Sequence, residues 1–343
     1  MDQQSRYESL DFLRGVAAIG VMFFHFSIIG IPIAAHGYLA VDMFFILSGF
    51  VMSHAYHNRL GSMELSYFVK IRLIRVLPLS FIGLIAGTIY FLVRYVLQPQ
   101  SQYSLIDIIG GTLFNMALIP KPWVTPTPTD TIFTSNTPLW SLSLEVLINF
   151  IWAAFLIERF KHIIPLIIFI SLTLIVAFSY ANGSADIGAT WPNYIGGLSR
   201  AAFGYFVGTM LWKYRPTPNK SLLYSLASSC LLILIIFTPD AGPLFDIIAI
   251  SIAFPLIIYM SACSDYGPER PLFKFIGNLS FPLYVIHVPI LQFLVGISKT
   301  VKINDGMYSL AIIASVACIA AAVCLDLLYD RPARKALSKF LFR

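Results

Sequence analysis

Charged residues are scarce in this chain of 343 residues. Asp, Glu, Lys and Arg make up 12% of it, whereas hydrophobic residues make up 58%. Soluble domains carry about 25% charged residues, and disordered chains combine few apolar residues with high charge. Both classes are therefore excluded. A polytopic membrane protein remains, and because one transmembrane helix needs about 20 apolar residues, the length allows up to about a dozen of them.

Cysteine and the common catalytic motifs are also nearly absent. The four cysteines lie within or at the edges of apolar runs, which excludes a disulfide framework or a zinc-binding spacing. The chain has no Walker loop, no GxSxG elbow and no HExxH motif. We therefore predict no metal site. The net charge of +6 does not indicate a nucleic-acid partner, because the basic residues form short clusters between apolar runs.

The apolar runs predict an all-α fold with about ten transmembrane helices. The expected spans are 10–30, 38–57, 76–97, 138–158, 163–180, 194–212, 221–238, 243–262, 279–298 and 307–329. Residues 103–119 are less apolar and contain Asp107, so we expect a re-entrant or interfacial segment there. One integral-membrane domain over residues 1–343, without an appended soluble domain, is expected.

The basic residues predict the orientation of these helices. With the N-terminus in the cytoplasm, seventeen of the 23 Lys and Arg residues fall in inner segments and three in outer ones. This asymmetry follows the positive-inside rule. It predicts that both termini are cytoplasmic. The expected location is the plasma (inner) membrane. The asymmetry also favours a segment 103–119 that does not cross.

Arg14 and His25 form a polar stripe on the first span. They are eleven residues apart, so at 100° and 1.5 Å per residue they share one face at about 16 Å separation. A charge near the bilayer centre costs at least about 2.5 kcal/mol, which makes such residues functional candidates. The alternatives are a snorkelling Arg14 and a His25 that only bonds a neighbouring helix.

Two carboxylates are expected near this stripe. Asp42 begins the second span at nearly the depth of His25, and Glu145 lies deep in the fourth. A carboxylate beside a histidine fixes its tautomer and raises its basicity. We therefore predict that Asp42 or Glu145 orients a catalytic His25. Asp42 as a helix cap, and Glu145 as the ion-pair partner of Arg200, are the alternatives.

Further polar residues lie at the predicted inner edge and on the ninth span. Arg72 and Arg75, with Lys70, form a basic cluster that suits an anionic, phosphate-bearing ligand or, alternatively, anionic membrane lipids. Tyr284 and His287 share a face with Ser280, where interhelical hydrogen bonds are the alternative function. The Gly204–Gly208 spacing predicts close helix packing.

The longest outer segment, residues 98–137, contains the sequence KPWVTPTPTDT. Proline restricts its own backbone and that of the preceding residue, which indicates an extended loop. A long ordered loop often forms a lid or a binding surface, whereas a mobile surface connection is the alternative. Trp123 is a candidate sugar contact or a residue of the interfacial aromatic belt.

Taken together, these segments resemble the acyltransferase 3 family of membrane O-acyltransferases. The resemblance covers nearly the whole chain. It rests on LDFLRGVAAIGVMFFHF at 10–26, GYLAVDMFFILSGFVMS at 37–53, FVKIRLIRVLP at 68–78, LWSLSLE at 139–145 and NLSFPLYVIHVPI at 278–290. The C-terminal YDRPARK resembles the family's ending, with one residue between Asp330 and Pro332.

The resemblance implies a ten-span enzyme that moves an acyl group, usually acetyl, from cytoplasmic acyl-CoA to a hydroxyl. The acceptor is often a sugar of an exopolysaccharide, a lipopolysaccharide or peptidoglycan, and polysaccharide-assembly proteins are possible partners. Positions of this chain that match the family's recurrent polar residues are Arg14, His25, Asp42, Arg72, Arg75, Glu145, Tyr284 and His287. Other classes that fit the composition are a transporter or flippase, and a structural partner of a polysaccharide complex.

These readings combine into one expected mechanism. Arg14, Arg72 and Arg75 receive the donor phosphates at the inner side, while His25 acts as a general base or carries the acyl group. Tyr284 and His287, expected nearer the inner half than His25, contact the thioester or the pantetheine arm.

Overall fold

The computed structural model describes residues 7–57, 59, 63–98, 103–125, 130–156, 161–215, 222–264, 270–301 and 307–342. These residues are 83% helical and contain no β-strand. An isolated antiparallel bridge joins Thr131 to Thr190. The predicted all-α class is confirmed. Residues 157–158 and 221, which belong to two of the expected spans, lie outside the described residues.

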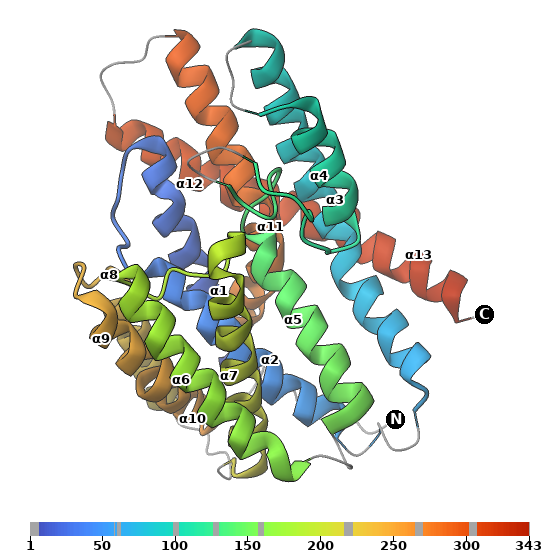
Figure 1. The fold of residues 1–343 in the computed structure, drawn as a ribbon, viewed down its shortest axis with the longest axis vertical. Coiled ribbons are helices and arrows are strands. Elements are labelled where there is room, and N and C mark those ends of the chain that lie inside the picture. The colour runs from blue at the N-terminus through green and yellow to red at the C-terminus, as the bar shows by residue number, and fades with distance from the viewer. Residues whose placement is uncertain are drawn as a thin grey trace.

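The described residues contain thirteen α-helices, which are labelled in Figure 1. They are α1 Glu8–Phe24, α2 Ala40–Tyr56, α3 Leu65–Leu97, α4 Gly111–Met116, α5 Leu139–Ile151, α6 Ile164–Asn182, α7 Tyr194–Lys213, α8 Leu222–Phe237, α9 Gly242–Ile248, α10 Phe254–Ala262, α11 Pro271–Val301, α12 Met307–Cys324 and α13 Arg331–Leu341. Wider helical turns connect α9 to α10 and α12 to α13, so each of these pairs forms one continuous helical segment.

Seven helical segments of the described chain are long and apolar enough to cross a membrane. They are Glu8–Ile29, Gly37–Tyr56, Leu65–Leu97, Ile164–Asn182, Gly242–Ala262, Pro271–Ser298 and Tyr308–Leu341. Each matches one predicted span. The remaining three predicted spans are also helical, but Leu139–Ala154 and Leu222–Phe237 are shorter, and α7 is not among the seven. These helices show an integral membrane protein, whereas the count of ten stays a prediction.

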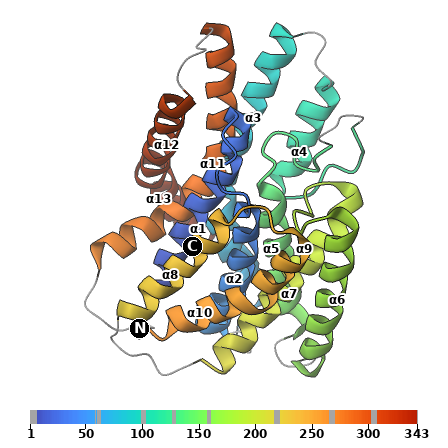
Figure 2. The same cartoon turned by 90° about the vertical axis from the view of Figure 1, so that its left-hand side faces the viewer.

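The helix α1 lies in the middle of the bundle, as Figures 1 and 2 show. It packs against α11 on one side and against α2 and α8 on others, while α2 packs against α7. Glycines allow the close approach of α2 and α7, because a Cβ on Gly204 would lie 2.7 Å from the Cβ of Phe45. The packing function predicted for Gly204 and Gly208 is confirmed. The packing of α1 against α11 brings the first and ninth predicted spans together.

The segment before α5 is folded rather than uniformly extended. Ile106–Met116 is helical but far shorter than the roughly 20 residues that cross a bilayer. The backbone N–H of Ile132 donates to Ala189 at 2.9 Å, and the Trp191 indole donates to the Lys121 carbonyl at 3.0 Å. These bonds hold the described residues of 103–137 against the connection between α6 and α7. Residues 99–102 and 126–129 of the predicted outer segment lie outside the described residues.

The carboxylate of Asp107 joins several residues of this segment by hydrogen bonds. It accepts hydrogen bonds from Thr125 at 2.6 Å, Ser104 at 2.7 Å and the Trp123 indole at 2.9 Å. Burial alone would raise the pKa of Asp107, but these bonds outweigh burial and lower the pKa to about 2. Trp123 is therefore held by Asp107 inside the segment.

Candidate functional site

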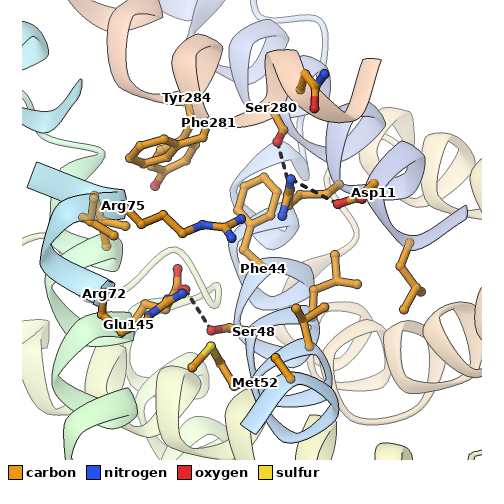
Figure 3. A pocket seen from close by; sticks show the side chains of 18 of the residues that line it. Asp11, Phe44, Ser48, Met52, Arg72, Arg75, Glu145, Ser280, Phe281 and Tyr284 are labelled. Carbon is orange, nitrogen blue, oxygen red and sulfur yellow. Dashed lines mark hydrogen bonds and ion pairs between the residues drawn. The ribbon is translucent and has the colours of Figure 1, made fainter. Parts of the chain in front are cut away.

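A cavity of about 760 Å³ lies between α1, α2, α3, α5 and α11 and reaches the start of α13. Figure 3 shows its wall, with basic side chains of α3 facing aromatic side chains of α2 and α11. The charged residues that line it are Arg14, Arg72, Arg75, Arg331, Arg334, Asp11, Glu145 and Asp326. Five arginines against three carboxylates make the cavity net positive. Such a lining favours an anionic ligand.

Arg14 is fixed where α1 meets α11. Its Nε donates to the Ser280 hydroxyl at 2.9 Å, and its Nη2 lies 3.2 Å from the Asp11 carboxylate. The two helices approach closely here, because a Cβ on Gly277 would lie 2.9 Å from the Cβ of Asp11. Arg14 is therefore held by a neighbouring helix and does not simply extend to the helix end.

Arg72 and Glu145 form an ion pair across the cavity wall. The Arg72 Nη2 lies 3.2 Å from Glu145 Oε1, and Ser48 Oγ donates to the same oxygen at 2.8 Å. Glu145 therefore contacts neither His25, which it was expected to orient, nor the alternative partner Arg200. Arg72 Nε is buried without a hydrogen-bond partner among the described residues. A donor is thus left available beside the cavity.

Arg75 extends from α3 into the cavity, between Glu145 and the ring of Phe44 (Figure 3). It forms no ion pair or hydrogen bond with any residue that the structure describes, unlike Arg72 on the same helix. A cation that lines a cavity without a protein anion is suited to a charged group of a bound molecule.

Arg331 and Arg334 were not among the residues singled out from the sequence. Arg331 pairs with Asp326 at 2.5 Å, and Arg334 pairs with Asp330 one turn earlier on the same helical segment. The RPARK sequence contains both residues, but its basic residues are also explained by the positive-inside rule and so did not indicate a ligand site. Only the packing of α13 beside α3 brings the two side chains to the cavity.

His25 and His287 lie together at the contact of α1 and α11. His287 Nε2 is 3.2 Å from His25 Nδ1, so both rings lie at one depth and the expected difference in depth is wrong. His25 is the residue directly after α1, and its Nδ1 lies 2.9 Å from the Val21 carbonyl. His287 Nδ1 lies 2.9 Å from the Leu283 carbonyl.

These contacts determine the tautomers of the neutral histidine pair. A carbonyl only accepts, so each Nδ1 must carry a proton. His287 Nε2 then accepts from His25 Nδ1–H, which is shared with Val21. His25 Nε2 keeps its lone pair. Since His25 is only partly buried, this nitrogen is available as a base.

Asp42 does not contact His25, contrary to the expected pairing. Its carboxylate binds Arg200 through two bonds, of 2.6 Å from Nη2 and 3.1 Å from Nε, and both side chains are fully buried. Arg200 also donates to the carbonyls of Tyr38 and Ile187. The side chain of Asp42 points from α2 toward α7, whereas His25 faces α11. This buried pair joins α2 to α7.

Tyr284 separates the cavity from the histidine pair. It lines the cavity, and its ring lies 6.0 Å from the ring of His287 and 5.5 Å from that of Phe44. Its hydroxyl donates to the Pro138 carbonyl at 2.8 Å and lies 2.5 Å from the Ser141 hydroxyl. The common face expected for Ser280, Tyr284 and His287 is present.

The structure therefore divides the predicted site into three places. The cavity gathers five of the predicted residues, namely Arg14, Arg72, Arg75, Glu145 and Tyr284. His25 and His287 form the adjacent pair, and Asp42 is built into the α2–α7 contact. In the described part of the chain, no three His, Cys, Asp or Glu side chains gather as metal ligands.

Comparison with known proteins identifies the family. A family model described as an acyltransferase domain matches residues 7–329. Peptidoglycan O-acetyltransferase OatA of Listeria monocytogenes serovar 1/2a is 24% identical over 335 residues, which cover 85% of this chain and 51% of OatA. YrhL of Bacillus subtilis (strain 168) is 22% identical over 329 residues, covering 84% of this chain and 49% of YrhL. The chain thus spans about half the length of these two relatives.

A third relative, Protein 2 in the picA locus of Rhizobium radiobacter, is 35% identical over 161 residues, or 43% of this chain and 81% of that protein. No solved structure is significantly similar to the chain. The family match extends over all the described helices except α13, and so over the histidine pair and every helix of the cavity but that one. The chain therefore belongs to the acyltransferase 3 family of membrane O-acyltransferases.

Proposed function

We propose that this protein transfers an acetyl group from acetyl-CoA, bound from the cytoplasm, to a sugar hydroxyl of a glycan outside the membrane. The observation that carries the proposal is the arginine-lined cavity beside the histidine pair. The relation to OatA, a peptidoglycan O-acetyltransferase by name, supports a glycan acceptor and an acetyl group. Family membership supports the acyl transfer itself.

The proposed orientation follows the distribution of basic residues. Ten helices cross the plasma membrane, and both termini are cytoplasmic. The cavity is lined by Arg14, Arg331 and Arg334, which lie near the two cytoplasmic ends of the chain in this topology. The cavity then opens toward the compartment that contains acyl-CoA. The described residues of the segment 103–137 lie on the acceptor side.

The donor fits the cavity by charge. CoA carries phosphates at one end and a long, thin pantetheine arm at the other. Among the described residues Arg75 forms no ion pair or hydrogen bond, and Arg72 Nε is a buried donor without a hydrogen-bond partner. Both side chains can therefore donate hydrogen bonds to phosphate oxygens. The arm would run toward Tyr284 and Phe44, beyond which the histidine pair lies.

His25 is the proposed general base. Its Nε2 removes the proton of the acceptor hydroxyl as the hydroxyl oxygen attacks the thioester carbon. A C–O bond forms and the C–S bond breaks, and the thiolate of CoA takes the proton back from His25. The imidazolium formed in between donates from Nδ1 to His287 Nε2 and the Val21 carbonyl. These two groups take the orienting function first expected of Asp42 or Glu145.

The thioester has to pass Tyr284 and Phe44 to reach His25. The Tyr284 hydroxyl is anchored to Pro138 and Ser141, at the start of α5. A rotation of this ring would connect the cavity to the histidine pair. We propose that the acyl donor enters by this movement.

The test uses purified protein in liposomes with labelled acetyl-CoA and an added peptidoglycan or polysaccharide fraction. Wild type is expected to consume the thioester and to label the glycan, whereas H25A retains the fold and loses transfer. Release of CoA without label on glycan or protein would indicate another acceptor. No thioester consumption by wild type would overturn the proposal and favour a transporter. Normal turnover by folded H25A would remove His25 as the base.

A further inference from the structure

Pro289 interrupts the hydrogen-bond ladder of α11 beside the histidine pair. In an α-helix the carbonyl of residue i accepts from the N–H of residue i+4, and proline has no N–H. The Val285 carbonyl therefore lacks its helical donor. The turn between Val285 and Pro289 is the one that carries His287. Because a buried carbonyl without a donor is costly, another group has to supply the hydrogen bond.

Asn136 supplies it from a distant part of the chain. Its Nδ2 donates to the Val285 carbonyl at 2.8 Å across 149 positions of sequence, and both residues are fully buried. Gly83 of α3 leaves the space for this bond, since a Cβ there would lie 2.7 Å from both Asn136 Nδ2 and the Val285 oxygen. The amide thus takes the place of the N–H that Pro289 lacks.

The segment that carries Asn136 is itself well anchored. The neighbouring Ser135 hydroxyl lies 2.7 Å from that of Thr112 and 3.1 Å from that of Thr88. Gly87 on α3 accommodates the Ser135 carbonyl, which a side chain would displace. Asn136 therefore holds Val285 from a fixed support that contacts both α3 and α4.

The same turn of α11 determines where His287 lies. His287 Nδ1 bonds the Leu283 carbonyl, and its Nε2 lies 3.2 Å from His25. A shift of this turn would lengthen the contact between the two rings. Asn136 does not line the cavity, and its side chain donates to Val285 rather than to His25, so it acts on the pair through α11.

We propose that Asn136 is a positioning residue for the histidine pair, through its hydrogen bond to the carbonyl that Pro289 leaves free. The inference rests on the proposed function, in which the pair activates the acceptor hydroxyl. It also links the outer segment before α5 directly to the helical turn of His287.

The decisive comparison is between two buried asparagines of the same segment. N136L removes the donor to Val285, whereas N115L removes a matched amide that donates to the carbonyls of Ile119 and Ile132. Asn115 is equally buried but has no bond to α11. We expect N136L to lower kcat roughly 10- to 100-fold, as for a misplaced catalytic group, with an unchanged KM for acetyl-CoA. N115L should keep the wild-type kcat.

A second variant tests the reason for the bond. P289A restores the N–H that Val285 lacks, so the loss of kcat caused by N136L should be much smaller in the P289A background. A structural function of Asn136 alone would lower the amount of folded protein without changing kcat. The comparison of N136L with N115L does not require P289A to be active.

The outcomes separate the two proposals. If wild type is active and H25A is inactive, but N136L has the wild-type kcat, the positioning inference is wrong and the proposed function stands. An equal fall in kcat for N136L and N115L would also overturn the inference. Wild type without acyl transfer overturns the proposed function, and the inference with it.

Discussion

Replacing Arg75 by methionine should weaken donor binding without weakening the fold. Arg75 lines the cavity and forms no ion pair with the described residues, so its removal leaves no carboxylate unpaired. A hydrogen bond to a charged group contributes about 1.5–3 kcal/mol. The loss of one such bond to phosphate corresponds to a roughly 10- to 150-fold higher Kd for acetyl-CoA. The midpoint of thermal unfolding without ligand should stay at the wild-type value.

Arg72 provides the contrasting case on the same helix. R72M removes a cation from the cavity as well as the partner of Glu145, whose carboxylate then keeps only Ser48. Breaking a buried pair costs about 3–5 kcal/mol, and the Glu145 side chain is 21% exposed, so we expect the lower end or less. R72M should therefore bind the donor weakly and also unfold at a lower temperature.

The assay is calorimetric titration of acetyl-CoA into purified protein, with thermal unfolding of the same samples. R94M is the matched control, because Arg94 lies on α3 outside the cavity. Its donor affinity should equal that of wild type. A wild-type Kd for R75M would refute the assignment of the cavity to the donor phosphates. A large loss of stability in R75M would contradict the absence of a protein partner.

Two further predictions concern the remaining charges. D42A leaves Arg200 buried without its carboxylate, so the free energy of unfolding should fall by about 3–5 kcal/mol, and D42L/R200M should recover most of it in thermal unfolding. Wild-type stability with lost turnover would instead favour the catalytic Asp42 expected from the sequence. Asp107 has a pKa of about 2 in the fold against about 3.9 unfolded, so its contribution to stability is present above about pH 4 and is lost as the pH falls toward 2. In wild type, the rate of amide hydrogen exchange at residues 121–125, relative to the unprotected rate at the same pH, should rise as the pH falls over this range. D107N should show fast exchange by this measure already at pH 5. Slow exchange in D107N would contradict this function of Asp107.

The sequence predicted the helices well because their signal is local. Each of the seven candidate spans matches an expected apolar run, since hydropathy depends only on neighbouring residues. The spacing of Arg14 and His25 placed them on one face of α1, and both indeed contact α11.

The pairing of charges was decided by tertiary structure alone. Sequence depth placed Asp42 beside His25, but the helix turns the carboxylate toward α7, where Arg200 satisfies it. Depth alone leaves the rotation of a helix and the identity of its neighbours undetermined. The contacting residues His25 and His287 are 262 positions apart in the sequence, so no pattern of neighbouring residues predicts their contact.

What the sequence determined by itself was the membrane-embedded helical class, the family and the set of polar residues that a bilayer makes costly. What only the folded chain decided was which of these residues meet. Arg75 points into a cavity while Arg72 is paired, although the two are three positions apart on one helix. Asn136 was not singled out, because a buried amide has a partner only once α3, α5 and α11 are packed together.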